Sequence, residues 1–130
     1  MAADCSVVLV TVPNLKTAEA VTDALLDQKL AACVNQIAGI KSSYWWEGKI
    51  DSAEEILLLI KTQTALIKRV MESVTQHHPY DVPEIIALPI SEGSKAYLDW
   101  IKTSTDSPQA ASSRPEKDGG MRQKNRSAKP

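Results

Sequence analysis

Phenylalanine is absent from this chain of 130 residues, and tryptophan and tyrosine contribute only three residues each. Hydrophobic residues still make up 43% of the sequence, so Leu, Ile and Val must supply the core. One domain is expected, because single cores typically need on the order of 100 to 150 residues. The formal net charge of −1 excludes an overall electrostatic field that would recruit nucleic acid or an acidic membrane surface.

Cysteine and long apolar runs are also scarce. Cys5 and Cys33 are too few for a disulfide framework, and two reduced, buried thiols are the expected state. No apolar run approaches the roughly 20 residues that a membrane-spanning helix needs. The first residues lack the basic segment of a secretory signal and have the pattern of a strand. The sequence therefore predicts a cytoplasmic protein, with a targeting segment missing from this sequence as the alternative.

Short apolar runs alternate with amphipathic segments along the first 104 residues. Composition and periodicity predict four strands, which lie at 5–13, 31–46, 54–62 and 83–90. The spacing of apolar residues predicts three helices, which lie at 15–30, 65–78 and 91–104. The order β-α-β-β-α-β with a terminal helix predicts an α+β, ferredoxin-like domain over residues 1–104.

Local signals refine these elements. Asn14 and Thr64 are the expected N-caps of the first two helices. Gly39 predicts a bulge or a bend in the second strand, and residues 47–49 predict a hairpin turn. Residues 50–54 predict an irregularity in the strand that returns from this turn. Apolar positions of the later helices are expected to point inward, and these are Leu66, Ile67, Val70, Met71, Val74, Tyr97, Leu98 and Ile101.

Residues 105–130 form a separate, polar and basic segment. From Ser104 onward there are six Lys or Arg against three Asp or Glu, and Met121 is the sole large apolar residue. Such a segment does not bury enough apolar surface to offset its ordering entropy, so a disordered tail is predicted. A solubilising extension is favoured over an arm that binds nucleic acid.

Two helices cover one face of a four-stranded sheet and leave the other face bare. The strands here are apolar enough to make that exposure costly. The simplest cover is a second sheet from another copy of the same chain, so the pattern predicts an oligomer.

The stretch "HHPYDVPE" (77–84) holds both histidines of the chain. Imidazole and carboxylate together suit Cu(II), Zn(II) or Ni(II). His77 and His78 cannot both point at one ion from a regular helix, but His77 and Glu84 can meet across the bend that two prolines set. His77 and Glu84 are therefore the candidate metal ligands. Three further side chains are secondary candidates: His78, Asp81 and Cys33.

Two alternatives compete with a metal site. His77 can cap the C-terminus of its helix, where a cation suits the helix dipole. Either histidine can also act as a general base, but no nucleophile elbow, phosphate loop or dinucleotide motif accompanies them. Cys33, in "AACVN", has no second thiol at redox spacing and is expected to be a small buried side chain. A non-enzymatic protein without an obligatory cofactor is therefore predicted.

Three adjacent aromatic residues, Tyr44, Trp45 and Trp46, precede the hairpin turn in "YWWEGK". Neighbouring side chains on a strand alternate between faces, so at least one ring lies outside the core of its own subunit. Exposed Trp and Tyr are typical interface anchors, and a subunit contact is the leading interpretation. A ligand-lined cleft between subunits comes second. Base stacking comes third, because no basic groove accompanies the rings.

Five stretches of the sequence resemble the CutA family, known as divalent-cation tolerance proteins. They are "KLAACVN" (29–35), "SYWWEGKI" (43–50), "IKT" (60–62), "HHPYDVPEIIALPI" (77–90) and "YLDWI" (97–101). The resemblance implies a ferredoxin-like subunit in a tight homotrimer, similar in architecture to the PII signalling proteins. It also implies binding of copper and other divalent ions and, in animals, a link to acetylcholinesterase processing. Tyr44, Trp45, Trp46, Lys61 and Tyr80 are the expected interface or cleft residues.

The resemblance also bears on the metal ligands. In the bacterial pattern associated with copper binding, the ligands match His77, Glu84 and a cysteine in the first strand. That cysteine falls at Val10 in this sequence. Cys5 lies about 16 Å away along an extended strand and does not substitute for it. Copper binding is therefore expected to be weak.

The leading functional prediction is a non-enzymatic trimer that binds divalent metal ions, copper among them, or a small anionic ligand in clefts between subunits. Its role would be metal-ion tolerance or PII-like signalling, although analogy between folds is a weak guide to function. The alternative is an interaction module that assists the maturation or localisation of another protein. Neither reading involves nucleic acid or a membrane.

Overall fold

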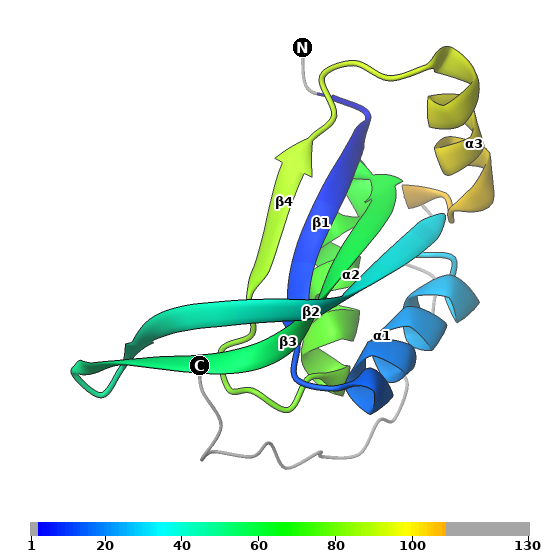
Figure 1. The fold of residues 1–130 in the computed structure, drawn as a ribbon. Coiled ribbons are helices and arrows are strands. Elements are labelled where there is room, and N and C mark those ends of the chain that lie inside the picture. Colours follow the sequence, from blue (N-terminus) through cyan, green and yellow to red (C-terminus); the bar gives the residue numbers. More distant parts are fainter. Residues whose placement is uncertain (1–2, 109–130) are drawn as a thin grey trace.

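A computed structural model describes residues 3–108 of the chain. Strands and helices follow the expected order: β1 (Cys5–Val12), α1 (Leu15–Asp27), β2 (Cys33–Trp46), β3 (Lys49–Gln63), a 3-10 turn η1 (Thr64–Leu66), α2 (Ile67–His77), β4 (Ile85–Pro89) and α3 (Lys95–Ser104) (Figure 1). The strands form one antiparallel sheet in the order β2-β3-β1-β4. This confirms the α+β class and the β-α-β-β-α-β order.

The core lies between one face of the sheet and the helices α1 and α2. Val8, Val10 and Val12 of β1 are fully buried there, together with aliphatic residues of the neighbouring strand and helices. Those partners are Leu58, Ile60, Ala18, Val21, Leu25, Val70 and Val74. Leu, Ile and Val thus fill the core, as the absence of phenylalanine requires. Pro89 ends β4, which lies at the edge of the sheet, where a residue without an N–H is tolerated.

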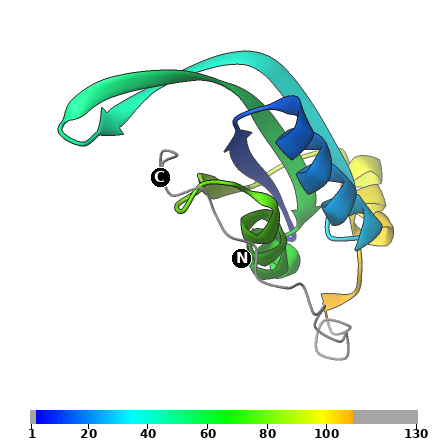
Figure 2. The same ribbon diagram turned by 90° about the horizontal axis from the view of Figure 1, so that it is seen from below.

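The hairpin of β2 and β3 extends well beyond the rest of the sheet (Figures 1 and 2). β1 pairs with β3 only from Ile56 to Gln63, so the remainder of the hairpin, residues 38–55, forms a projecting arm. A two-residue turn joins its strands, with positive φ at Glu47 (50°) and Gly48 (79°), as type I′ hairpins require.

The irregularity of this hairpin lies in β2, not in β3. The register shifts between Ile37 and Ile40, where Gly39 adopts a φ of 80°, and this confirms the predicted bulge. Pairing is regular through residues 50–54, so the irregularity expected there was wrong. Cross-strand hydrogen bonds with β2 hold this polar segment in the ladder despite its low strand propensity.

The face of the sheet opposite α1 and α2 is apolar. Side chains alternate along each strand, and the register places aliphatic residues of all four strands on this face. We call it the open face, and its aliphatic residues are Val7, Leu9, Ile37, Leu57, Leu59, Ile86 and Leu88. Three of them, Ile37, Ile86 and Leu88, are 43%, 49% and 48% exposed. The apolar second face expected from the sequence is therefore present.

The helix caps and inward positions differ in part from expectation. Asn14 caps α1, and its Oδ1 accepts a hydrogen bond from the Thr17 amide at 2.8 Å. Thr64 does not cap α2: it begins η1, and its hydroxyl lies 2.8 Å from that of Ser6. Met71 and Tyr97 were expected to point inward but are 38% and 42% exposed.

The ordered body continues past α3. Thr105, the first residue of the predicted tail, is buried, and its Oγ1 accepts a hydrogen bond from Gln63 at 2.8 Å. Asp106 forms an ion pair with Arg69 of α2 at 3.3 Å. These two residues pack against the body, while 109–130, most of the predicted tail, lie outside the described residues.

Candidate functional site at the bend after the second helix

His78 lies inside the bend that joins α2 to β4, residues 78–84, and is 3% exposed. Its Nδ1 accepts a hydrogen bond from the Tyr80 amide at 3.2 Å. Its Nε2 lies 2.7 Å from the carbonyl oxygen of Thr11, at the end of β1. Because a carbonyl only accepts, Nε2 carries the proton and the ring is the neutral tautomer. Both nitrogens are engaged, so His78 is a structural residue that fastens the bend to β1.

Tyr80 fastens the same bend to the arm. Its ring lies 4.6 Å from that of His78, and its hydroxyl donates a hydrogen bond to Oε2 of Glu55 at 3.0 Å. Both side chains are buried, Tyr80 at 6% and Glu55 at 2% exposure. Burial first, and the Glu55 carboxyl second, raise the pKa of the Tyr80 phenol well above its ordinary value. The hydroxyl thus stays protonated and acts as the donor.

His77 and Glu84, the candidate metal ligands, are both more accessible than His78. His77 is half-buried as the last residue of α2, and its Nδ1 donates to the carbonyl oxygen of Ser73 at 2.8 Å. Nε2 of His77 forms no hydrogen bond with the described residues and is available to a ligand. Glu84 is exposed. The capping role expected as the alternative is present, and it leaves one nitrogen of His77 unused.

Val10, the position of the cysteine in the copper-binding pattern, is fully buried in the core between the sheet and the helices. Within residues 3–108, His, Cys, Asp and Glu side chains nowhere gather in groups of three that could hold a metal ion. Residues 3–108 therefore offer at most a sparse ligand set at this bend. Such a set leaves most positions on a metal ion to water.

Tyr44, Trp45 and Trp46 lie near the tip of the arm. Trp45 is 72% exposed and stands opposite Ile50, which is 68% exposed. Tyr44 and Trp46 lie on the other side of the hairpin and are half-buried. The alternation expected from the sequence is therefore observed. A pair of large apolar side chains at the end of a projecting arm is an unusual exposure for a single chain.

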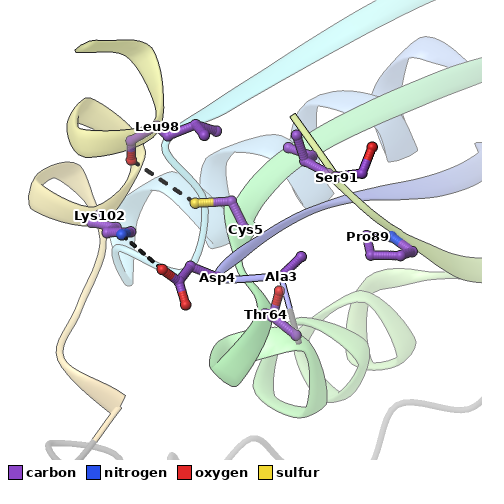
Figure 3. A pocket seen from close by; sticks show the side chains of 9 residues that line it. Ala3, Asp4, Cys5, Thr64, Pro89, Ser91, Leu98 and Lys102 are labelled. Carbon is purple, nitrogen blue, oxygen red and sulfur yellow. Dashed lines mark hydrogen bonds and ion pairs between the residues drawn. The ribbon is translucent and has the colours of Figure 1, made fainter. Parts of the chain in front are cut away.

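A cavity of about 770 Å³ lies at the opposite end of β1, between the N-terminal residues, the end of β4 and α3 (Figure 3). The Cys5 thiol lies in it and donates to the carbonyl oxygen of Leu98 at 3.9 Å, and burial raises the pKa of this thiol. Lys102 forms an ion pair with Asp4 at 3.0 Å beside it. The cavity is remote from the bend, and its thiol is held in the unreactive, protonated form.

Lys61 lies on the open face, between Cys33 of β2 and Val7 of β1 in the register. Its ammonium donates a hydrogen bond to Oδ1 of Asn35, which also accepts one from the thiol of Cys33 at 3.8 Å. Cys33 was expected to be buried but is only half-buried. Burial first, and the adjacent Cys33 second, raise the pKa of the Tyr97 phenol on α3. We call Lys61, Asn35, Cys33 and Tyr97 the Lys61 cluster.

The fold and these sites define a class: a small α+β domain with an uncovered apolar sheet face, a projecting hairpin and polar groups at the margins of both. The family model described as CutA1 divalent ion tolerance protein matches residues 6–104. The chain belongs to the CutA1 family, as its sequence motifs predict.

Relatives from plants and bacteria support this assignment. The chain is 50% identical over 99 residues to "Protein CutA 1, chloroplastic" of Oryza sativa, covering 76% of this chain and 56% of the relative. It is 48% identical over 99 residues to the divalent-cation tolerance protein CutA of Thermus thermophilus, covering 76% and 96%. The chain thus spans little more than half the length of the rice relative but nearly all of the bacterial one.

Solved structures show the same fold. The crystal structure of CutA1 from Oryza sativa matches with a TM-score of 0.78 at 48% identity, covering 81% of this chain and 96% of that one. The Thermus thermophilus protein matches with a TM-score of 0.77 at 46% identity, covering 78% and 99%. None of the helices in residues 3–108 has the length and apolar character to cross a membrane. The cytoplasmic location expected from the sequence stays a prediction, beside plant relatives named chloroplastic.

Proposed function

We propose that this protein works as a non-enzymatic homotrimer that binds divalent cations through the bend and the clefts between subunits. The observation that carries the proposal is the open face. Aliphatic side chains of four strands lie together there, and Ile37, Ile86 and Leu88 are nearly half exposed in one subunit. Contiguous apolar surface of this kind marks an interface, and another copy of the chain supplies a complementary sheet.

The arm supports the same assembly. It projects from the body, and Trp45 and Ile50 at its end are the most exposed large apolar side chains in the described part of the chain. An arm that reaches over a neighbouring subunit would bury this pair, as aromatic anchors are buried at the centre of interfaces. Three copies arranged in this way give the PII-like trimer implied by the resemblance.

For the cation, we propose His77 as the principal protein ligand, with Glu84 as its companion. Nε2 of His77 is free of hydrogen bonds within the described part, and the bond from Nδ1 to Ser73 orients the ring. Two ligands favour weak binding in the order Cu(II) over Ni(II) and Zn(II). A small anionic ligand is the second candidate for the clefts, and a role in metal-ion tolerance follows the description of the family.

The test combines mass measurement with metal titration. Light scattering at micromolar concentration should give a trimer, and a folded monomer would contradict the assembly. Cu(II) titrated into the parent should bind weakly, and acidification should release it because protons compete with the metal for its ligands. His77→Ala should abolish binding and Glu84→Gln should weaken it, while Glu92→Gln, at another exposed carboxylate, serves as the control. Equal binding by His77→Ala and the parent would refute this ligand.

A second candidate function is a module that binds another protein, and the exposure of Trp45 favours it. If the arm engages a partner and not a neighbouring subunit, Trp45 stays exposed in the assembled protein. Iodide quenching of tryptophan fluorescence measures this exposure directly. Strong quenching that Trp45→Ser removes, in a sample shown to be trimeric, would favour the interaction module.

A further inference from the structure

The Lys61 cluster has more hydrogen-bond donors than acceptors. Oδ1 of Asn35 is the acceptor for both the Lys61 ammonium and the Cys33 thiol. Lys61 forms no ion pair with any carboxylate of residues 3–108. Two of the ammonium hydrogens and the whole NH₂ group of Asn35 therefore have no acceptor in this part of the chain. The phenol of Tyr97 lies at the edge of the cluster, where it is engaged with the Cys33 side chain.

The Lys61 cluster, with its excess of hydrogen-bond donors, lies on the apolar open face. By register, Lys61 lies beside Val7, which pairs in turn with Leu88, so aliphatic side chains of the open face adjoin the ammonium. If a second copy covers this face, as the proposed trimer requires, the cluster loses much of its water. An ammonium enclosed without a counter-charge is strongly unfavourable, and an unpaired amide adds to that cost. An anion on the cluster removes both penalties.

We propose that the Lys61 cluster is an oxyanion site, which binds the carboxylate or phosphate group of a small molecule between subunits. Lys61 supplies the positive charge, and the NH₂ group of Asn35 supplies a directed donor. Charge-assisted hydrogen bonds of this kind are shorter and stronger than neutral ones. The proposal rests on the trimer proposed above and names the chemistry of the ligand in its clefts.

The experiment uses the full chain, with sodium phosphate and sodium acetate as probes. Each is titrated by calorimetry at fixed ionic strength against sodium chloride. Lys61→Met removes the charge and keeps a side chain of similar length. Asn35→Asp replaces the donor with an acceptor and gives Lys61 an internal carboxylate. Lys41→Met is the matched control, since Lys41 is an exposed lysine on the same hairpin that forms no hydrogen bond or ion pair through its side chain with residues 3–108.

The expected result is binding of at least one probe by the parent and by Lys41→Met, and binding at least tenfold weaker in Lys61→Met and Asn35→Asp. Preference between phosphate and acetate tells which oxyanion the site takes. No heat from either probe beyond the chloride blank, or equal binding by Lys61→Met and the parent, overturns the proposal. A trimer structure in which a carboxylate of a neighbouring subunit forms an ion pair with Lys61 also overturns the proposal.

Failure of this proposal is distinguishable from failure of the trimer. Light scattering is run on every sample that enters the calorimeter. A monomeric parent that still binds phosphate through Lys61 removes the trimer and keeps the oxyanion site. A trimeric parent that binds neither probe removes the oxyanion site and keeps the trimer. Asn35→Asp should preserve the trimer best, because its new ion pair neutralises Lys61 without any ligand.

Discussion

Replacing Tyr80 with phenylalanine tests the link between the bend and the arm. The change removes one hydroxyl, which donates to Glu55 at 3.0 Å, and keeps the ring that lies against His78. Both partners are buried, at 6% and 2% exposure, so water does not replace the lost donor freely. Removing one partner of such a pair costs about 1–3 kcal/mol. We expect Tyr80→Phe to lower the free energy of unfolding by this amount.

The pKa of Tyr80 gives the same prediction a pH signature. Its pKa in the folded protein is raised above the ordinary value of 10.0, by burial first and by Glu55 second. Above pH 10 the phenol of the unfolded chain loses its proton, whereas the phenol of the folded protein keeps it because its pKa is raised. The stabilisation is therefore complete below pH 10 and declines above it, by about 1.4 kcal/mol between pH 9 and pH 11. Tyr80→Phe has no phenol to titrate and lacks this decline. The difference in free energy of unfolding between parent and variant should therefore become smaller as the pH rises from 9 to 11.

Urea unfolding at pH 8, 9, 10 and 11 measures both effects, with the protein concentration fixed because the proposed assembly would contribute to stability. Taking the difference between parent and variant cancels the titration of every other group. Glu55→Gln is the companion variant, since its amide oxygen still accepts from Tyr80. A loss below about 0.5 kcal/mol in Tyr80→Phe, or a gap that stays constant up to pH 11, would refute the reasoning.

Three further predictions concern other parts of the molecule. Ile86→Lys should change the stability of an isolated subunit by less than about 0.5 kcal/mol but disrupt the proposed trimer, so an intact trimer by light scattering would contradict an interface on the open face. A chain ending at residue 108 should have the melting temperature of the parent. A chain ending at 104 loses the ion pair between Asp106 and Arg69 of α2, so its free energy of unfolding should fall by about 1–3 kcal/mol. Equal melting temperatures of the two chains would count against docking of residues 105–108. Cys5 should react with a thiol reagent more slowly than Cys33, because burial raises its pKa, and equal rates by mass spectrometry would contradict this.

The elements were predictable where the signal is local. Asn14 caps α1 through an amide three residues away, and Gly39 bends β2 through its own φ, so neither depends on distant chain segments. Thr64 failed as a cap because its hydroxyl bonds Ser6, which lies 58 residues away in sequence. Tyr97 failed as an inward residue because α3 packs against the end of the sheet through Ile101 and leaves one side to solvent.

The functional residues were less predictable, because their roles are set by tertiary contacts. His77 and His78 are adjacent and chemically identical in sequence, yet one is half-buried and the other is locked between Thr11 and Tyr80. The period-two pattern gave no signal for Glu55, because it alternates along β3 with Ile56 of the core and shares the side of Leu57 and Leu59. Its hydrogen-bond partner, Tyr80, lies 25 residues later in the bend.

The contrast between the bend and the open face separates structural polar groups from candidate binding groups. At the bend, His78, Tyr80 and Glu55 bond within the subunit, so their chemistry is engaged in holding the chain. On the open face, Lys61 has only one amide oxygen to bond and no counter-charge within the described residues. Some polar groups lack a hydrogen-bond acceptor or counter-charge within their own chain. If the apolar surface around such a group becomes covered, a partner from outside that chain must supply one. The same reasoning applies to the uncovered aliphatic residues around it, so the proposed assembly and the proposed ligand site both follow from one surface.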